Sequence, residues 1–174
     1  MTRNPRRLAV FAASAAAIIV LSGCGLQQDL SQVPNLGSDP KGPATPITAP
    51  TLSGTRFDWS STHGHVVVLN FWGSWCSPCR LEQPALNQLH TEFAPRGVIF
   101  LGVDLREANA VDGIAFERNF HVAYPSVNDP GEVITSEYNV IDPPTIVVID
   151  AHGNIVDRFL STTSGVSADL RRLS

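Results

Sequence analysis

Residues 67–84 have the sequence VVLNFWGSWCSPCRLEQP. The apolar run over residues 66–71 is rich in β-branched side chains, which is typical of a buried strand. Residues 79–93 carry apolar side chains at helical spacing, and Pro84 should kink the helix that they form. The stretch therefore predicts a buried strand that leads, through two cysteines, into a helix.

Cys76 and Cys79 lie at this junction with two residues between them. Their spacing puts both sulfur atoms on one face of the first helical turn, where unpaired backbone N–H groups and the helix dipole favour the thiolate form of Cys76. Pro78 suits this turn because its φ is already helical and its missing N–H is not needed there. We expect Cys79 to be the more buried thiol. The pair is interpreted as a redox-active dithiol.

The rest of the chain alternates between strand and helix patterns. Apolar runs predict strands and helical spacing predicts helices, with strands at residues 98–103, 145–149 and 155–160 and helices at residues 111–120, 133–138 and 167–173. A glycine-containing loop at residues 150–154 joins the last two strands as a tight hairpin. This order is typical of an α/β protein with a mixed central sheet.

The N-terminal segment has the features of an export signal. Three arginines lie within residues 3–7, and a largely apolar stretch follows over residues 8–21, which is short for a membrane span. The sequence Leu21-Ser22-Gly23-Cys24 resembles the lipobox of bacterial lipoproteins, which implies cleavage before Cys24 and attachment of lipid to its thiol. An uncleaved N-terminal anchor is the alternative interpretation.

Composition divides the chain into three expected segments. Residues 1–23 are the expected signal peptide, and residues 24–51 are the lipidated Cys24 followed by a tether that is rich in proline and lacks aromatic residues. Apolar periodicity begins at Leu52, so residues 52–174 are the expected folded domain.

Charge and cysteine content exclude several classes of protein. The formal net charge is −4, and the expected signal peptide holds three arginines and no acid, so the remainder is more acidic still. An acidic domain disfavours a nucleic-acid partner, because phosphate binding needs a basic surface. The chain has three cysteines, too few for a disulfide-rich scaffold, and no second CxxC pair that would complete a zinc site. We expect no cofactor and no metal.

Residues 67–84 resemble the active-site segment of the thioredoxin superfamily, most closely its extracytoplasmic TlpA/ResA-like branch of thiol–disulfide oxidoreductases, which includes bacterial lipoproteins. The resemblance runs from about Leu52 to Leu173. It implies a thioredoxin-like fold, with a central mixed sheet flanked by helices. It also implies a TlpA/ResA-type insert, which residues 106–129 would form and which would supply partner contacts near the active site.

The resemblance assigns roles to individual residues. Cys76 matches the nucleophile and Cys79 the resolving cysteine. Pro144 matches the cis-proline that faces the cysteines, a bond that proline almost alone tolerates. Trp75, Pro143 and Pro144 would contact the substrate. The residue before the cis-proline usually offers its N–H and C=O to the substrate, but Pro143 has no N–H, so we expect a weaker main-chain clamp and a preference for a shaped partner.

The acidic group of the site is expected on the helix. Asn70 stands where thioredoxin has a buried aspartate, and it cannot titrate. Glu82, three residues after Cys79, matches the glutamate of the ResA-like branch. We expect Glu82 to carry the proton of Cys79, with a pKa raised by burial. A solvated glutamate without a role is the alternative.

These assignments imply a membrane-tethered enzyme on the extracytoplasmic face of the cell membrane. By resemblance, this monomer would reduce the haem-binding cysteines of apocytochrome c during cytochrome c maturation, and a membrane thiol reductant of the CcdA/DsbD type would recharge it. An oxidase that forms disulfides in exported proteins is the main alternative. A peroxidase and a copper chaperone are further alternatives, but the cysteine spacing fits neither. We interpret the histidines as surface side chains.

Overall fold

The computed structural model of the protein describes residues 42–161 and 163–174. The expected signal peptide at residues 1–23, the expected lipidation site Cys24 and the first part of the tether, residues 24–41, lie outside the described residues. Among the helices that are described, none is long and apolar enough to cross a membrane.

A five-stranded mixed sheet forms the centre of the fold, in the order β3-β2-β1-β4-β5. Strand β1 (Val67–Trp72) is parallel to β2 (Ile99–Leu105), which is parallel to β3 (Ser126–Asp129). On its other side β1 is antiparallel to β4 (Thr145–Ile149), which is antiparallel to β5 (Ile155–Leu160). Every residue of β1 and β4 is buried, as expected for apolar runs in the middle of a covered sheet.

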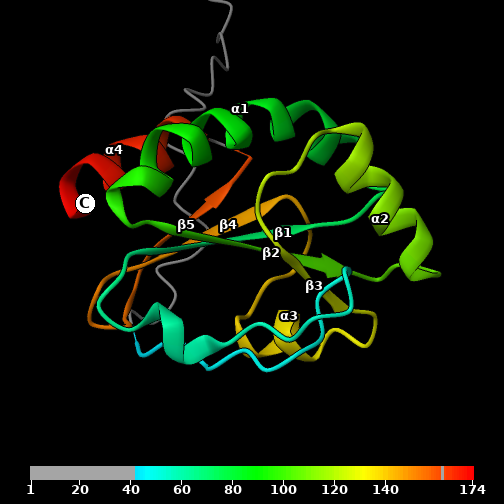
Figure 1. The fold of residues 1–174 in the computed structure, drawn as a ribbon, viewed down its shortest axis with the longest axis horizontal. Coiled ribbons are helices and arrows are strands. Elements are labelled where there is room, and N and C mark those ends of the chain that lie inside the picture. The colour runs from blue at the N-terminus through cyan, green and yellow to red at the C-terminus, as the bar shows by residue number, and fades with distance from the viewer. Residues whose placement is uncertain (1–41, 162) are drawn as a thin grey trace, which may run out of the picture. The chain divides into compact units, whose positions relative to one another are not determined.

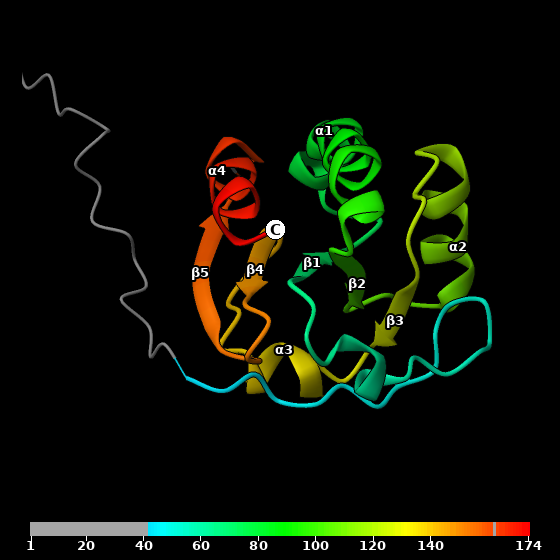
Figure 2. The ribbon, with the colours of Figure 1, turned by 60° about the vertical axis from the view of Figure 1, so that its left-hand side comes forward.

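Helices cover both faces of this sheet (Figures 1 and 2). Helices α1 (Ser77–Phe93), α2 (Ala110–Asn119) and α4 (Thr163–Leu173) lie on one face, and α3 (Val133–Glu137) lies on the other with the segment that precedes β1. Alternate residues of the strands supply the two apolar cores. Val68 and Val148 pack toward α1 and α4, whereas Leu69 and Val147 pack toward α3.

The predicted elements are present within a few residues of their expected bounds, and the thioredoxin-like architecture is confirmed. Pro84 lies inside α1. Strand β3 was not predicted, because its short sequence Ser126–Asp129 has a single apolar residue and it lies at the sheet edge beside β2. Residues 106–129, the expected insert, contribute α2 and this edge strand.

The expectation that residues 24–51 form a tether is wrong for residues 42–51, the part that the structure describes. Ile47 is 1% exposed within the core that faces α3, and the N–H of Ala44 donates to the carbonyl of Gly153 at 2.8 Å. Thr51 forms an isolated bridge with Val127 of β3. A few apolar residues between prolines were enough to anchor this extended segment, so the folded domain begins before Leu52.

Candidate functional site

Cys76 and Cys79 form a disulfide at the junction between β1 and α1, with their Cα atoms 5.3 Å apart. Cys76 is the N-cap of α1, and its sulfur accepts a hydrogen bond from the N–H of Cys79 at 3.2 Å. Each residue is 3% exposed, so the expected difference in burial is wrong. Both cysteines belong to one apolar cluster with Trp72 and Phe116, which covers them alike.

The turn between β1 and the disulfide is held by several hydrogen bonds. Trp75 is 47% exposed, and its indole N–H donates to the carbonyl of Leu105 at 3.2 Å. A Cβ atom on Gly73 would lie 2.6 Å from that indole nitrogen, so only glycine lets the ring fold back toward β2. From the other side, the guanidinium of Arg80 donates to the carbonyl of Ser74 through Nε at 3.0 Å.

A carboxylate at the end of β2 fixes the same turn. The backbone N–H of Ser74 donates to Oε1 of Glu107, and the Ser74 hydroxyl donates to Oε2 at 3.0 Å. Glu107 is 9% exposed. With these two hydrogen bonds Glu107 ties the residues just before Cys76 to the end of β2.

A second acid, Asp104, is fully buried behind the turn. It pairs with Trp72 across β1 and β2, and neither of its oxygens has a hydrogen-bond donor among the described residues. Burial raises the pKa of Asp104 to about 9, with the charges of Glu107 and Glu117 adding to the effect. A Cβ atom on Gly113 of α2 would lie 2.2 Å from Oδ2, so this glycine makes room for the carboxyl. Asp104 is therefore neutral at pH 7.

Glu82 lies one turn into α1 and is buried, with no hydrogen-bond partner for either oxygen among the described residues. Burial raises the pKa of Glu82, as expected. Asn70 is buried nearby on β1 and donates to the hydroxyl of Tyr124 at 3.2 Å. The alternative of a solvated Glu82 does not hold, whereas its exchange of a proton with Cys79 stays a prediction.

The loop before β4 lies at the same end of the sheet as the disulfide turn. The peptide bond between Pro143 and Pro144 is cis, and Pro144 is buried. The next residue, Thr145, pairs with Phe71 near the carboxyl end of β1. The disulfide turn, which follows β1, and the cis-proline loop, which precedes β4, therefore lie at the same end of these two antiparallel strands. That Pro144 faces the cysteines stays a prediction.

A groove of about 420 Å³ runs beside the disulfide turn between α1 and the inserted helix α2. Ser74 and Arg80 line it on the side of the turn, and α2 with its following residue contributes Asp112, Ala115, Phe116, Asn119 and Phe120. The insert thus borders the redox site directly.

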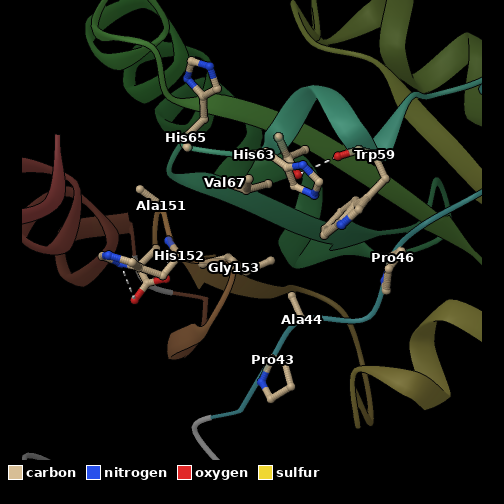
Figure 3. Close-up of a pocket in the computed structure, with 14 residues that line it drawn as sticks. Pro43, Ala44, Pro46, Trp59, His63, His65, Val67, Ala151, His152 and Gly153 are labelled. Atoms are coloured by element: carbon tan, nitrogen blue, oxygen red, sulfur yellow. Dashed lines mark hydrogen bonds and ion pairs between the residues drawn. The ribbon is translucent and has the colours of Figure 1, made fainter.

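A cavity of about 390 Å³ lies at the other end of β1, near its first residue Val67 (Figure 3). His63, His65 and His152 line it, all three are exposed, and their rings point in different directions (Figure 3). Among the described residues no group of three or more metal-ligating side chains is placed to hold an ion. These histidines are surface side chains, as expected, and this cavity is separate from the cysteines.

Three functional candidates escaped the sequence analysis, namely Asp104, Arg106 and Glu107. An acid that interrupts the apolar run of β2 was a signal for Asp104, because an ionisable side chain in a buried strand needs an explanation. The other two stand in a polar stretch after the strand. Nothing in the pattern distinguishes them from surface charges until β1 and β2 are placed side by side.

The first prediction concerns Glu82. Replacing it in Glu82→Gln should slow disulfide exchange by the reduced protein by about 10-fold or more, because general-base assistance is typically worth at least this much. The pH titration of the cysteine thiolates should shift in the same variant. The exposed Glu92→Gln on the same helix is the control. An unchanged rate together with an unchanged thiol titration would remove Glu82 from the chemistry.

The second prediction concerns Asp104. Its native pKa of about 9 lies above its ordinary value of 3.8, so the folded state keeps a proton that the unfolded state releases between these values. The free energy of unfolding should therefore fall as pH rises through this window, by up to about 1.4 kcal/mol per pH unit. Asp104→Asn should remove this fall and gain up to about 4 kcal/mol on the wild type between pH 5 and pH 8.

Urea unfolding of the oxidised proteins at both pH values measures this difference. Asp112→Asn, an exposed acid on α2, is the matched control and should keep the wild-type slope. Parallel pH profiles for the wild type and Asp104→Asn would contradict a buried, neutral Asp104.

Comparison with known proteins agrees with this site. The model of the AhpC/TSA family matches residues 40–158. The chain is 33% identical over 110 residues to the thiol-disulfide oxidoreductase ResA of Bacillus cereus, a match that covers 63% of this chain and 62% of ResA. It is 34% identical over 113 residues to the thioredoxin-like protein YneN of Bacillus subtilis, covering 64% and 66%. The chain thus spans less than two thirds of the length of these relatives.

Solved structures give the same result. A secreted Mycobacterium tuberculosis disulfide oxidoreductase, homologous to E. coli DsbE, superposes with a TM-score of 0.65 at 31% identity, over 74% of this chain and 96% of that one. A secreted thiol-disulfide isomerase from Corynebacterium glutamicum superposes with a TM-score of 0.66 at 28% identity, over 73% and 81%. The chain therefore belongs to the AhpC/TSA family, as a thioredoxin-like protein similar to the ResA and DsbE thiol–disulfide oxidoreductases.

Proposed function

We propose that this protein is an enzyme that reduces protein disulfides outside the cytoplasm by dithiol–disulfide exchange. The observation that carries the proposal is the Cys76–Cys79 disulfide, formed at the N-terminus of α1 at the same end of the sheet as the cis Pro143–Pro144 bond. The names of the relatives support the reaction class, and two of the solved relatives are described as secreted.

The exchange proceeds in two steps that conserve electrons. The thiolate of Cys76 attacks one sulfur of the substrate disulfide, which forms a mixed disulfide and releases one substrate thiolate. Cys79 then gives its proton to Glu82 and attacks the sulfur of Cys76. This step forms the Cys76–Cys79 disulfide and breaks the mixed disulfide, and the second substrate sulfur leaves as a thiolate that takes the proton back from Glu82. Two electrons have passed from the enzyme to the substrate, and an external dithiol must return them.

Buried charge favours this direction of electron flow. Among the described residues the buried acidic and basic side chains are all carboxyls, with no lysine, arginine or histidine, and Glu82 and Glu107 lie around the disulfide turn beside the neutral Asp104. Carboxylates disfavour a nearby thiolate. Strongly oxidising dithiol proteins owe their high reduction potential to a stabilised reduced form. A cysteine pair whose thiolate is not stabilised therefore has a lower reduction potential and is the better reductant.

The substrate and partners follow from the resemblance to ResA. We propose apocytochrome c, with its haem-binding cysteines oxidised, as the substrate, and a membrane thiol reductant of the CcdA/DsbD type as the electron donor. Lipid on Cys24 would hold the enzyme, as a monomer, at the extracytoplasmic face of the membrane. The groove beside α2 is the proposed contact surface for a shaped partner.

An oxidase with the same exchange steps is the second candidate, since exported proteins are where disulfides persist. The helix N-terminus at Cys76 is the observation in its favour, because it stabilises a thiolate. The family match alone does not separate a peroxidase from a disulfide exchanger. The paired Cys76 and Cys79 favour exchange, since both thiols are held in one disulfide.

The third prediction tests this function. In the full-length protein, Cys79→Ser removes the thiol that resolves the mixed disulfide, so the reduced variant should remain covalently linked to apocytochrome c that carries an oxidised haem-binding pair. Non-reducing electrophoresis detects the adduct, and the Cys76→Ser variant should give none. The wild-type protein should reduce the same substrate to two free thiols.

Equal capture of exported proteins that have no haem-binding cysteines would contradict the specific substrate. Net formation of disulfides in a reduced substrate by the oxidised wild type would favour the oxidase.

A further inference from the structure

Arg106 stands immediately after β2 and contacts both sides of the redox site. Its guanidinium carbon lies 4.9 Å from the centroid of the Trp75 ring. Its Nη2 atom is 2.7 Å from Oδ1 of Asp142, and its Nε atom is 3.1 Å from Oε1 of Glu132. One planar group therefore contacts the turn before Cys76, the loop before the cis-proline and the start of α3.

The backbone around Arg106 is shaped for this placement. Arg106 has a φ of 55°, in the left-handed region, which is unusual for a residue other than glycine. Its neighbours Leu105 and Glu107 bind the same turn, through the Trp75 indole and through Ser74. Glu132 has a φ of 55° as well. Two residues in this uncommon conformation meet in one ion pair, so the local structure holds them there.

Each partner of Arg106 is itself anchored. The carbonyl of Asp142 accepts a hydrogen bond from the hydroxyl of Thr145 at 2.7 Å, which ties the loop to the first residue of β4. Glu132 directly precedes α3, whose first N–H group, that of Val133, donates to Asp129 at 2.8 Å. The two ion pairs of Arg106 therefore join segments that are themselves held by hydrogen bonds.

We call the Trp75 turn, residues 73–75, and the loop before β4, residues 141–144, the two walls of the redox site, because they lie at the same end of the paired strands β1 and β4 and Arg106 contacts both. Cys76 is almost completely buried, so a substrate disulfide reaches its sulfur only between exposed groups at the rim. Trp75, at 47% exposed, and Ile141, at 85% exposed, lie one on each wall. A protein segment that carries a disulfide must contact both walls at once, whereas a small disulfide need not.

We propose that Arg106 is a positioning residue that sets the spacing of these two walls and thereby selects protein disulfides over small ones. The inference rests on the proposed disulfide exchange and deepens it by naming a residue that governs substrate class. Arginine suits the task because its rigid, planar guanidinium bonds two carboxylates while it stacks on an aromatic ring, which the single ammonium of lysine cannot do.

The fourth prediction uses the full-length protein with two substrates, insulin and glutathione disulfide. Arg106→Gln should raise KM for insulin at least fivefold with kcat within twofold of the wild type. Its rate with glutathione disulfide, and its equilibrium constant with the glutathione couple, should stay within twofold. A general loss of structure would change all of these quantities together, so the selective change separates positioning from folding.

Three further variants complete the test. Arg96→Gln is the matched control, since Arg96 also lies over an aromatic ring, Phe93, at 5.0 Å and faces an acid, Glu92, at 3.9 Å, but at the opposite end of α1 from the cysteines. It should leave both substrates unaffected. Arg106→Lys should resemble Arg106→Gln with insulin. Asp142→Asn should raise KM for insulin, and adding it to Arg106→Gln should have little further effect, because the two residues act through one contact.

Several results would overturn the proposal. One is a wild-type KM for insulin in Arg106→Gln, and another is an equal loss of rate with insulin and with glutathione disulfide. Additive effects of Arg106→Gln and Asp142→Asn would also contradict it. So would wild-type kinetics of Arg106→Lys, which would mean that the positive charge alone suffices. A wild-type protein that reduces oxidised apocytochrome c but neither insulin nor glutathione disulfide would overturn this inference alone. A wild-type protein that reduces none of the three would overturn the proposed function, and this inference with it.

Discussion

The turn that joins β1 to α1 is the constraint on which the rest of the structure depends. Within a few residues the chain must leave a fully buried strand, place Cys76 as the N-cap of a helix and bring Cys79 within bonding distance of it. Gly73 provides the space and Pro78 the helical φ. The carboxyl end of β2 then holds the turn through its backbone and Glu107, and α2 covers it through Phe116.

This arrangement surrounds the disulfide with acids and apolar side chains. The helix N-terminus stabilises a thiolate on Cys76, while the carboxylates of Glu82 and Glu107 oppose negative charge in the same region. The balance between the two determines the reduction potential. Asp104 adds a neutral carboxyl at physiological pH, since its pKa lies near 9. Burying this group lowers the free energy of unfolding, and such costs are commonly found at functional sites.

Local patterns in the sequence predicted much of the fold and the centre of the site. The apolar run of β1, the spacing of Cys76 and Cys79 and the two prolines at residues 143–144 each have a strong local signal. Strand β3 and the packing of Ile47 have none, because they depend on partners that are distant in sequence. The same holds for Arg106 and Glu107, whose importance comes from the pairing of β2 with β1 and not from the residues beside them.

The reduction potential of the Cys76–Cys79 pair tests the central claim most directly. The full-length protein would be equilibrated in thiol–disulfide buffers of defined potential while the fluorescence of Trp75, which borders the disulfide, reports its state. We expect a value near that of thioredoxin, about −270 mV, because buried acids near the cysteines disfavour the thiolate and make the pair a better reductant. A value near about −120 mV, as in a strong oxidant, would contradict the proposed direction of electron flow.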